Sequence, residues 1–176
     1  MAKKAITIQG RTSILGIIKN VQDKIDSTIQ KAVDRFCYVG ERCVVEARKA
    51  GEYNDITGNL RSSIGYVVLF NGQPYQYSKS RVFRGREYKN KTYKGKKLVR
   101  KKGNTGVNEG QAFLERLAGE FASRYPQGIV LIVAAGMEYA IYVEAIHNLN
   151  VLTSAELLAD ELVPIVLQKL GFTKKV

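Results

Sequence analysis

The sequence predicts an α+β fold, in which a small antiparallel sheet packs against a long N-terminal helix and a C-terminal helix, with a long basic loop insertion. Two observations lead to this prediction. Apolar residues recur at helical spacing near both ends of the chain, and short apolar, β-branched runs lie between them. We expect residues 1–176 to form a single domain, the helices to cover one face of the sheet, and residues 71–108 to protrude as the basic loop.

The N-terminal third is predicted to be a short strand followed by one long helix. Residues 5–8 alternate small or apolar with polar side chains, as a strand does. From about residue 12 to about residue 50, apolar residues recur at steps of three and four, which predicts a helix with one buried stripe. Gly40 interrupts the pattern, and we expect a break or bend there because glycine costs about 1 kcal/mol relative to alanine in a helix. The stripe consists of Ile14, Ile18, Val21, Ile25, Ile29, Val33, Phe36, Cys43 and Ala47.

The middle of the chain is predicted to contain two strands and a helix. Residues 52–59 are polar and predict a loop, and residues 63–70 are apolar and β-branched and predict a strand. Asn108 is a candidate cap for a helix whose apolar face extends to Phe121. Residues 129–135 form a continuous apolar run, which favours a central strand.

The C-terminal part is predicted to be a strand and a final helix. Residues 139–145 alternate and predict the return arm of a hairpin with the preceding strand, which places Tyr142 and Glu144 on one outward face. Tyrosine is enriched in interfaces, so this face is a candidate subunit contact, with a solvated sheet face as the alternative. Thr153 and Glu156 form a capping-box pattern for a helix that ends near Gly171 and that Pro164 should kink.

Positive charge is concentrated in one segment. The chain carries 28 Lys and Arg and 16 Asp and Glu, a net charge of +12, and residues 79–108 alone carry 12 basic and one acidic side chain. Such a segment is expected to contact phosphates of nucleic acid or an acidic protein surface, or to be a solvated loop without a partner. The interleaved Phe83, Tyr88 and Tyr93 can stack on bases or anchor the loop. The candidate contact residues are Arg81, Arg84, Arg86, Lys89, Lys91, Lys94, Lys96, Lys97, Arg100, Lys101 and Lys102.

The residues that usually carry catalysis do not form a recognisable pattern. His147 is the only histidine and lies in a predicted loop. Cys37 and Cys43 are six residues apart, about 240° around a helix, and are predicted to be small buried hydrophobes rather than metal ligands. Since glycine-rich phosphate-binding motifs are also missing from the sequence, we expect a non-enzymatic protein without cofactor or metal.

The chain is also expected to be intracellular and not secreted. Its longest apolar run, residues 129–135, is far shorter than the ~20 residues that span a bilayer, and the first residues are not followed by the apolar core of a signal peptide. We therefore expect no membrane partner.

Three stretches together resemble a known family. They are AITIQG at residues 5–10, TGNLRSSI at residues 57–64 and MEYAIYVE at residues 137–144. In this combination the chain resembles the tail-component or tail-completion family of long-tailed bacteriophages, minor virion proteins of the neck between the head-tail connector and the tail tube.

The resemblance implies a structural function. It implies an oligomeric adaptor, arranged as a ring, that joins head and tail or completes the tail end in the virion and is assembled in the host cytoplasm. The implied partners are further copies of the chain and neighbouring connector and tail proteins, and the basic loop, which is not part of the resemblance, would present its charge to packaged DNA or to an acidic neighbouring ring. The alternative is a free nucleic-acid-binding protein that uses the basic loop.

Overall fold

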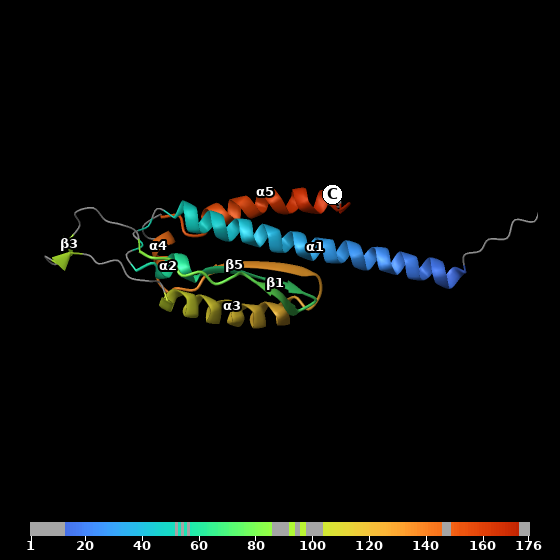
Figure 1. Cartoon of the computed structure of the whole chain (residues 1–176), viewed down its shortest axis with the longest axis horizontal. Coiled ribbons are helices and arrows are strands. Elements are labelled where there is room, and N and C mark those ends of the chain that lie inside the picture. The colour runs from blue at the N-terminus through green and yellow to red at the C-terminus, as the bar shows by residue number, and fades with distance from the viewer. Residues whose placement is uncertain are drawn as a thin grey trace, which may run out of the picture.

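The structure is a computed structural model, and it describes residues 13–51, 53, 55, 57–85, 92–93, 96–97, 104–145 and 149–172. The α+β prediction is confirmed, since long N-terminal and C-terminal helices pack with a three-stranded antiparallel sheet (Figure 1). In chain order the elements are α1 (Ile14–Ala50), α2 (Asn59–Ser63), β1 (Ile64–Phe70), β2 (Gln73–Tyr77), β3 (Thr92–Tyr93), β4 (Lys96–Lys97), α3 (Asn104–Arg124), β5 (Ile129–Ala135), α4 (Ala140–Ala145) and α5 (Thr153–Lys169).

The main sheet has the strand order β2-β1-β5, with both pairs antiparallel. β1 is central and buried along almost its whole length, whereas β5 forms an edge and is only partly buried. The bounds predicted for the strand at residues 129–135 are confirmed, but its predicted central position is wrong. A continuous apolar run requires cover on both faces, and an edge strand between two layers of helices meets that condition as well.

Helices cover both faces of the sheet, α1 and α5 one face and α3 the other (Figure 1). Alternate residues of β1 therefore enter separate cores. Tyr66 and Val68 join the core beside α1 and α5, and Val67 and Leu69 join the core beside α3, which includes Leu114. The expectation that helices cover a single face is therefore wrong.

α1 passes through Gly40 as one continuous helix, so the expected break at this residue is wrong. Gly40 is buried against β1 and β5. A Cβ added there would lie 2.6 Å from the Tyr66 ring and 3.0 Å from a methyl carbon of Leu131. The glycine therefore makes room for the tyrosine rather than ending the helix.

The apolar stripe of α1 is buried only in the second half of the helix. The buried residues of α1 run from Ala32 to Ala47, whereas the first half projects beyond the sheet and α5 (Figure 1). The prediction of one buried stripe is thus wrong for the first half. Ile14 is 77% exposed and Val21 51% exposed. A helix of 37 residues is about 55 Å long, and a seven-residue strand covers only about 24 Å of it.

Residues 139–145 were expected to form a strand, but the structure contains the short helix α4 instead. Alternation of larger and smaller residues over seven positions fits a strand, yet two turns of helix also accommodate it. In a helix, residues two apart point about 200° away from each other, so Tyr142 and Glu144 do not share a face. The face assignment behind the predicted subunit contact is therefore wrong.

The predicted C-terminal helix is confirmed, but its cap differs from the expected one. Thr153 is the first residue of α5, and Leu152 at the cap position gives no side-chain hydrogen bond, so the Thr153–Glu156 capping box is wrong. A carboxylate oxygen of Glu144 instead accepts from the backbone N–H groups of Leu152 and Thr153, both at 2.9 Å. Gly171, with a φ of 86°, ends the helix as expected, and Pro164 lies within it.

The segment at residues 71–108 is more structured than the predicted loop. Asn71 and Gly72 both have positive φ, as a two-residue hairpin turn requires, and they connect β1 to β2. β2 was missed because its side chains are mostly exposed and show no apolar pattern. α3 begins at Asn104, four residues before its predicted cap Asn108, so the inserted part lies between β2 and α3, where β3 and β4 pair with each other.

Two predictions lie outside the described residues, the strand at residues 5–8 and the loop around His147. Among the helices of the described part of the chain, none combines the length and the apolar composition needed to cross a bilayer.

Candidate functional site

The short helix α2 contacts the chain near the start of residues 79–108, the basic stretch. Gly58, just before α2, has a φ of 77°, and a Cβ there would lie 2.3 Å from the carbonyl oxygen of Phe83. The Ser62 hydroxyl donates to the carbonyl of Gly58 at 2.6 Å and accepts from the backbone N–H of Phe83 at 2.8 Å. Phe83 therefore packs directly on the turn, which only glycine permits.

Arg61 of α2 makes the second contact with this part of the chain. Its guanidinium pairs with the carboxylate of Asp55, whose side chain is 1% exposed, and donates to the backbone carbonyl of Arg84 at 2.7 Å. A buried carboxylate needs such a partner, because an unpaired buried charge is strongly destabilising. The pair thus fixes the backbone at Arg84 while the Arg84 side chain is exposed.

Three guanidinium groups surround the ring of Phe83. The guanidinium carbons of Arg48, Arg61 and Arg81 lie 5.2, 5.1 and 5.1 Å from the ring centre, within the range of cation–π attraction. Arg48 also donates to the backbone carbonyl of Ile64 at 2.7 Å. Burial lowers the pKa of Arg48, and the positive charge of Arg81 lowers it further. The cluster is therefore a concentration of positive charge, where an anion would be attracted.

The basic stretch ends at the same helix at which it begins. The backbone N–H of Gly106, near the start of α3, donates to the side-chain oxygen of Asn59 at 3.2 Å. The approach is close, since a Cβ on Gly106 would lie 2.0 Å from the Asn59 carbonyl oxygen. Phe83 and Gly106, which lie on either side of residues 85–104, are thus both held at α2.

The second and third stretches of the resemblance, about 80 residues apart in sequence, meet at this end of the molecule. The side chains of Thr57 and Tyr139 form a hydrogen bond, and burial raises the pKa of Tyr139. The backbone N–H of Gly136 donates to the carbonyl of Ser63 at 3.2 Å. The polar residues of both stretches are therefore used to hold segments together.

The structure separates the two residues predicted as a subunit contact. Tyr142 is 52% exposed. Glu144 faces α5 instead: besides the two backbone N–H groups, the Thr153 hydroxyl donates to it at 2.7 Å. Burial raises the pKa of Glu144, but the hydrogen bonds from Thr153 and from backbone N–H groups together outweigh burial and hold it below its ordinary value. Glu144 is thus a cap for α5.

The predicted basic contact residues are only partly described. The side chains of Arg81 and Arg84 are exposed beside α2. Lys96 and Lys97 belong to β4, where only the backbone is described. The other predicted contacts, Arg86, Lys89, Lys91, Lys94, Arg100, Lys101 and Lys102, lie outside the described residues.

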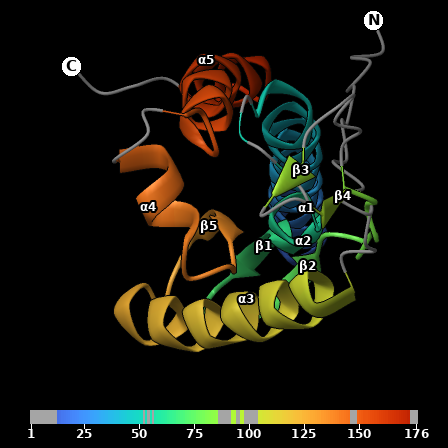
Figure 2. The ribbon, with the colours of Figure 1, turned by 90° about the vertical axis from the view of Figure 1, so that its left-hand side faces the viewer.

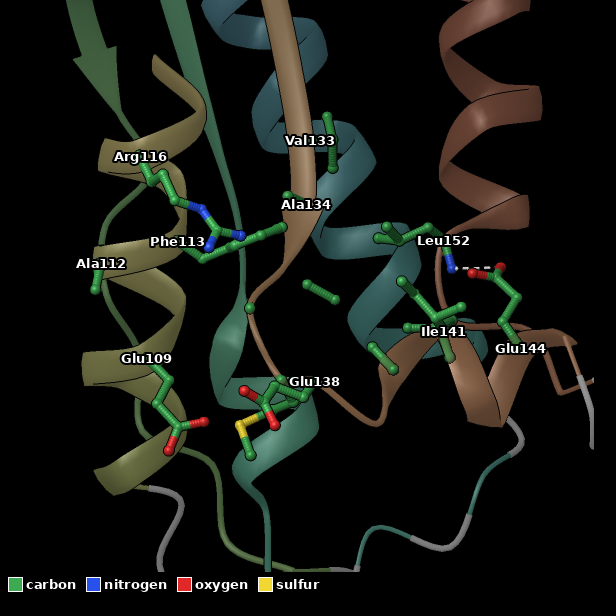
Figure 3. Close-up of a pocket in the computed structure, with 15 residues that line it drawn as sticks. Glu109, Ala112, Phe113, Arg116, Val133, Ala134, Glu138, Ile141, Glu144 and Leu152 are labelled. Atoms are coloured by element: carbon green, nitrogen blue, oxygen red, sulfur yellow. Dashed lines mark hydrogen bonds between the residues drawn. The ribbon is translucent and has the colours of Figure 1, made fainter. Parts of the chain in front are cut away.

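α3 lies on one side of β5, and α4 with the start of α5 lies on the other (Figure 2). A groove runs between them, beside the edge of β5 that pairs with no described strand (Figure 3). Its volume is about 770 Å³, in the range of ligand and peptide sites. Apolar side chains dominate one wall, including Met137, Ile141 and Leu152, and the α3 wall carries Glu109 and Phe113. Sequence reasoning missed this groove, because it depends on β5 being an edge strand.

The two cysteines are confirmed as buried and unpaired. Burial raises the pKa of both the Cys37 and the Cys43 thiol, which disfavours the reactive thiolate form. Among the residues that the structure describes, three or more potential metal ligands do not come together at any point.

The exposed apolar residues of the first half of α1 were also missed as a functional surface. A signal was present in the sequence, since the helical pattern is too long to be covered by strands of seven residues. We name this surface the α1 row: Ile14, Leu15, Ile17, Ile18, Val21 and Ile25, each between 46% and 78% exposed.

Comparison of the chain with family models, with curated protein sequences and with solved structures produces no match. The bacteriophage resemblance therefore rests on the three sequence stretches.

Proposed function

We propose that this protein is a non-enzymatic structural component of a bacteriophage virion, an oligomeric adaptor that joins head and tail at the neck or completes the tail end. The observation that carries the proposal is the contact between residues 57–64 and 137–144, made by the hydrogen bond between Thr57 and Tyr139 and continued by the bond between Ser63 and Gly136, the residue just before residues 137–144. Stretches that share one structural task are expected to occur together in a family.

Oligomerisation is supported by the α1 row. Large contiguous apolar surfaces on a protein mark sites of interaction, and the row continues the buried stripe of the same helix into solvent. In the proposed function, neighbouring copies cover these side chains. Repeated contacts between two different surfaces close into a ring when the rotation permits.

The basic stretch would supply the contact with a negatively charged neighbour. Phe83 and Gly106, near its two ends, are held at α2, beside the exposed Arg81 and Arg84. Packaged DNA and an acidic surface of a neighbouring connector or tail protein are the two partners that this charge fits.

The direct test is electron microscopy of purified virions with an antibody against this chain. We expect label at the head-tail junction or at the tail end. Label on the capsid surface, or virions that lack the chain altogether, would contradict the proposal.

A second candidate is a free nucleic-acid-binding protein, favoured by the positive cluster around Phe83. Replacing Lys94, Lys96, Lys97 and Arg100 with serine tests whether these side chains contact phosphate. If all four contact phosphate, the slope of log K against log salt for DNA binding falls by up to about 4, with no change in melting temperature. An unchanged slope leaves the acidic protein surface as the partner, which a docking assay with the neighbouring virion protein measures.

A further inference from the structure

The free edge of β5 leaves the main sheet open on one side. No strand among the described residues pairs with this edge, although helices cover both faces of the sheet up to it. Native proteins normally cover or interrupt such an edge, because an apolar edge strand pairs readily with other chains. The groove beside it is therefore shaped for a fourth strand.

The hydrogen-bonding groups that face the groove follow from the strand register. Gly136 N–H bonds to Ser63, and the Gly128 carbonyl accepts from Asn71, so the even-numbered residues of this segment pair with β1. In an antiparallel pair the alternate residues point their N–H and C=O groups to the other side. Val133 and Ala135 therefore present their backbone groups to the groove, whose lining they form.

The two walls of the groove differ in chemistry. The wall on the α4 and α5 side carries the apolar Ile141 and Leu152, and the Glu144 carboxylate in it is bonded to the start of α5. The α3 wall is mixed, with Glu109 and Arg116 beside apolar side chains. A strand that fits has large apolar side chains on one face and small or polar ones on the other.

Residues 5–8 of this chain have that pattern. Ile6 and Ile8 fall on one face of a strand, and Ala5 and Thr7 fall on the other. Charge agrees as well, because residues 1–12 contain three basic side chains and no acidic one, whereas Glu109 and Glu138 line the groove.

A chain cannot place these residues in its own groove. Ile29, Ala32 and Phe36 of α1 line a cavity together with Ile129, the first residue of β5, and even Ile29 lies about 22 Å from Ile14 along the helix. The Val133–Ala135 end of β5 is a further 15 Å or so beyond Ile129, again away from Ile14. The chain from Ile14 back to Ile8 spans at most about 21 Å when fully extended, well short of that distance.

We propose that residues 5–8 of a second copy add as a strand to the free edge of β5, with Ile6 and Ile8 against the α4 and α5 wall. This inference rests on the proposed ring function and names the contact on which the ring depends, with the α1 row covered only once this contact has joined the copies. The donor segment and the acceptor groove are different surfaces of one chain, so each copy gives a strand to one neighbour and receives one from another. Such a contact is heterologous, and it closes a ring when the rotation between neighbouring copies permits.

The test uses two variants of the full chain that block opposite halves of the contact. Ile6→Asp with Ile8→Asp removes the donor, and Ile141→Asp charges the acceptor wall at a side chain that is 78% exposed and so contributes little to the fold. Sedimentation velocity should show oligomers for the wild type, monomers for each variant alone, and a heterodimer for their equimolar mixture. The matched control is Leu157→Asp, 66% exposed on α5 outside the groove lining, which should assemble as the wild type does.

A synthetic peptide of residues 2–12 provides an independent measurement, because it should bind the donor variant with one-to-one stoichiometry and should not bind the Ile141→Asp variant.

A monomeric wild type, a donor variant that still assembles, or a mixture without heterodimer would overturn the inference. The inference would also be overturned by a dimer formed through the α1 rows of two copies, if Ile18→Asp abolishes that dimer and the donor variant still forms it. A wild-type monomer that binds the peptide only after its own residues 6 and 8 are changed would show that the chain fills its own groove. These outcomes are independent of the antibody label, so failure of the contact and failure of the neck function can be told apart.

Discussion

The two halves of α1 have the same apolar periodicity and opposite surroundings. In the second half, Val33, Val39 and Val44 are at most 1% exposed and belong to the core that α1 forms with the sheet and α5. In the first half, Ile18 is 59% and Val21 is 51% exposed. The comparison teaches that helical periodicity identifies the face that avoids water, while the length of the neighbouring elements decides how much of that face the same chain can cover.

The largest expected difference between the halves comes from one substitution made in each. Val33→Asp places a carboxylate in the core without a partner and should cost more than about 4 kcal/mol, a large part of the stability of an ordinary domain. Val21→Asp, on the same stripe, should change the free energy of unfolding by less than about 0.5 kcal/mol. Urea denaturation of both variants, at concentrations where the wild type is monomeric, measures the two values. Equal losses in the free energy of unfolding would show that the first half of α1 is also covered by other parts of the same chain.

A smaller effect is expected from alanine in place of helical glycines. Gly40→Ala should destabilise by about 1–3 kcal/mol, because the added Cβ meets the Tyr66 ring at 2.6 Å in a packed core. Gly119→Ala in α3 is the matched control. A Cβ there meets nothing within 4 Å, so the better helix propensity of alanine should stabilise by about 0.5–1 kcal/mol. Thermal melts show whether each substitution raises or lowers the stability. A Gly40→Ala variant that is more stable than the wild type would mean that the Tyr66 ring moves to make room for the added Cβ.

The smallest effect concerns Glu144, which fixes the start of α5 and hence which half of α1 is covered. Glu144→Ala should destabilise by about 1–2 kcal/mol, because the backbone N–H groups of Leu152 and Thr153 lose their acceptor. Calorimetry at neutral pH measures the loss.

The pH dependence of the same residue gives an independent check. The pKa of Glu144 in the folded protein lies below its ordinary value of 4.5. Its contribution is therefore fully present above about pH 4.5 and is lost as the pH falls through the lower folded value. The difference in melting temperature between the wild type and Glu144→Gln should shrink on acidification below that pH. A constant difference would mean that the charge of Glu144 does not contribute.

Several elements could be predicted because their cause is local. The stripe of α1, the bounds of β5 and the glycine stop of α5 depend on residues within a few positions of one another. α4 could not be predicted, since alternation over residues 139–145 suits a strand and only the contacts of Tyr139 and Ala140 with the rest of the fold favour a helix. β2 was missed because an exposed strand carries no apolar signal.

The candidate site divides in the same way. The sequence alone determined the fold class, the concentration of basic residues between 79 and 108, and the burial of both cysteines, since each follows from composition or from spacing along one element. Only the tertiary structure decided that α2 anchors both ends of the basic stretch, that Glu144 caps α5, and that β5 has a free edge beside an apolar groove. These features join residues distant in sequence, and their positions depend on how the layers of helix and sheet pack.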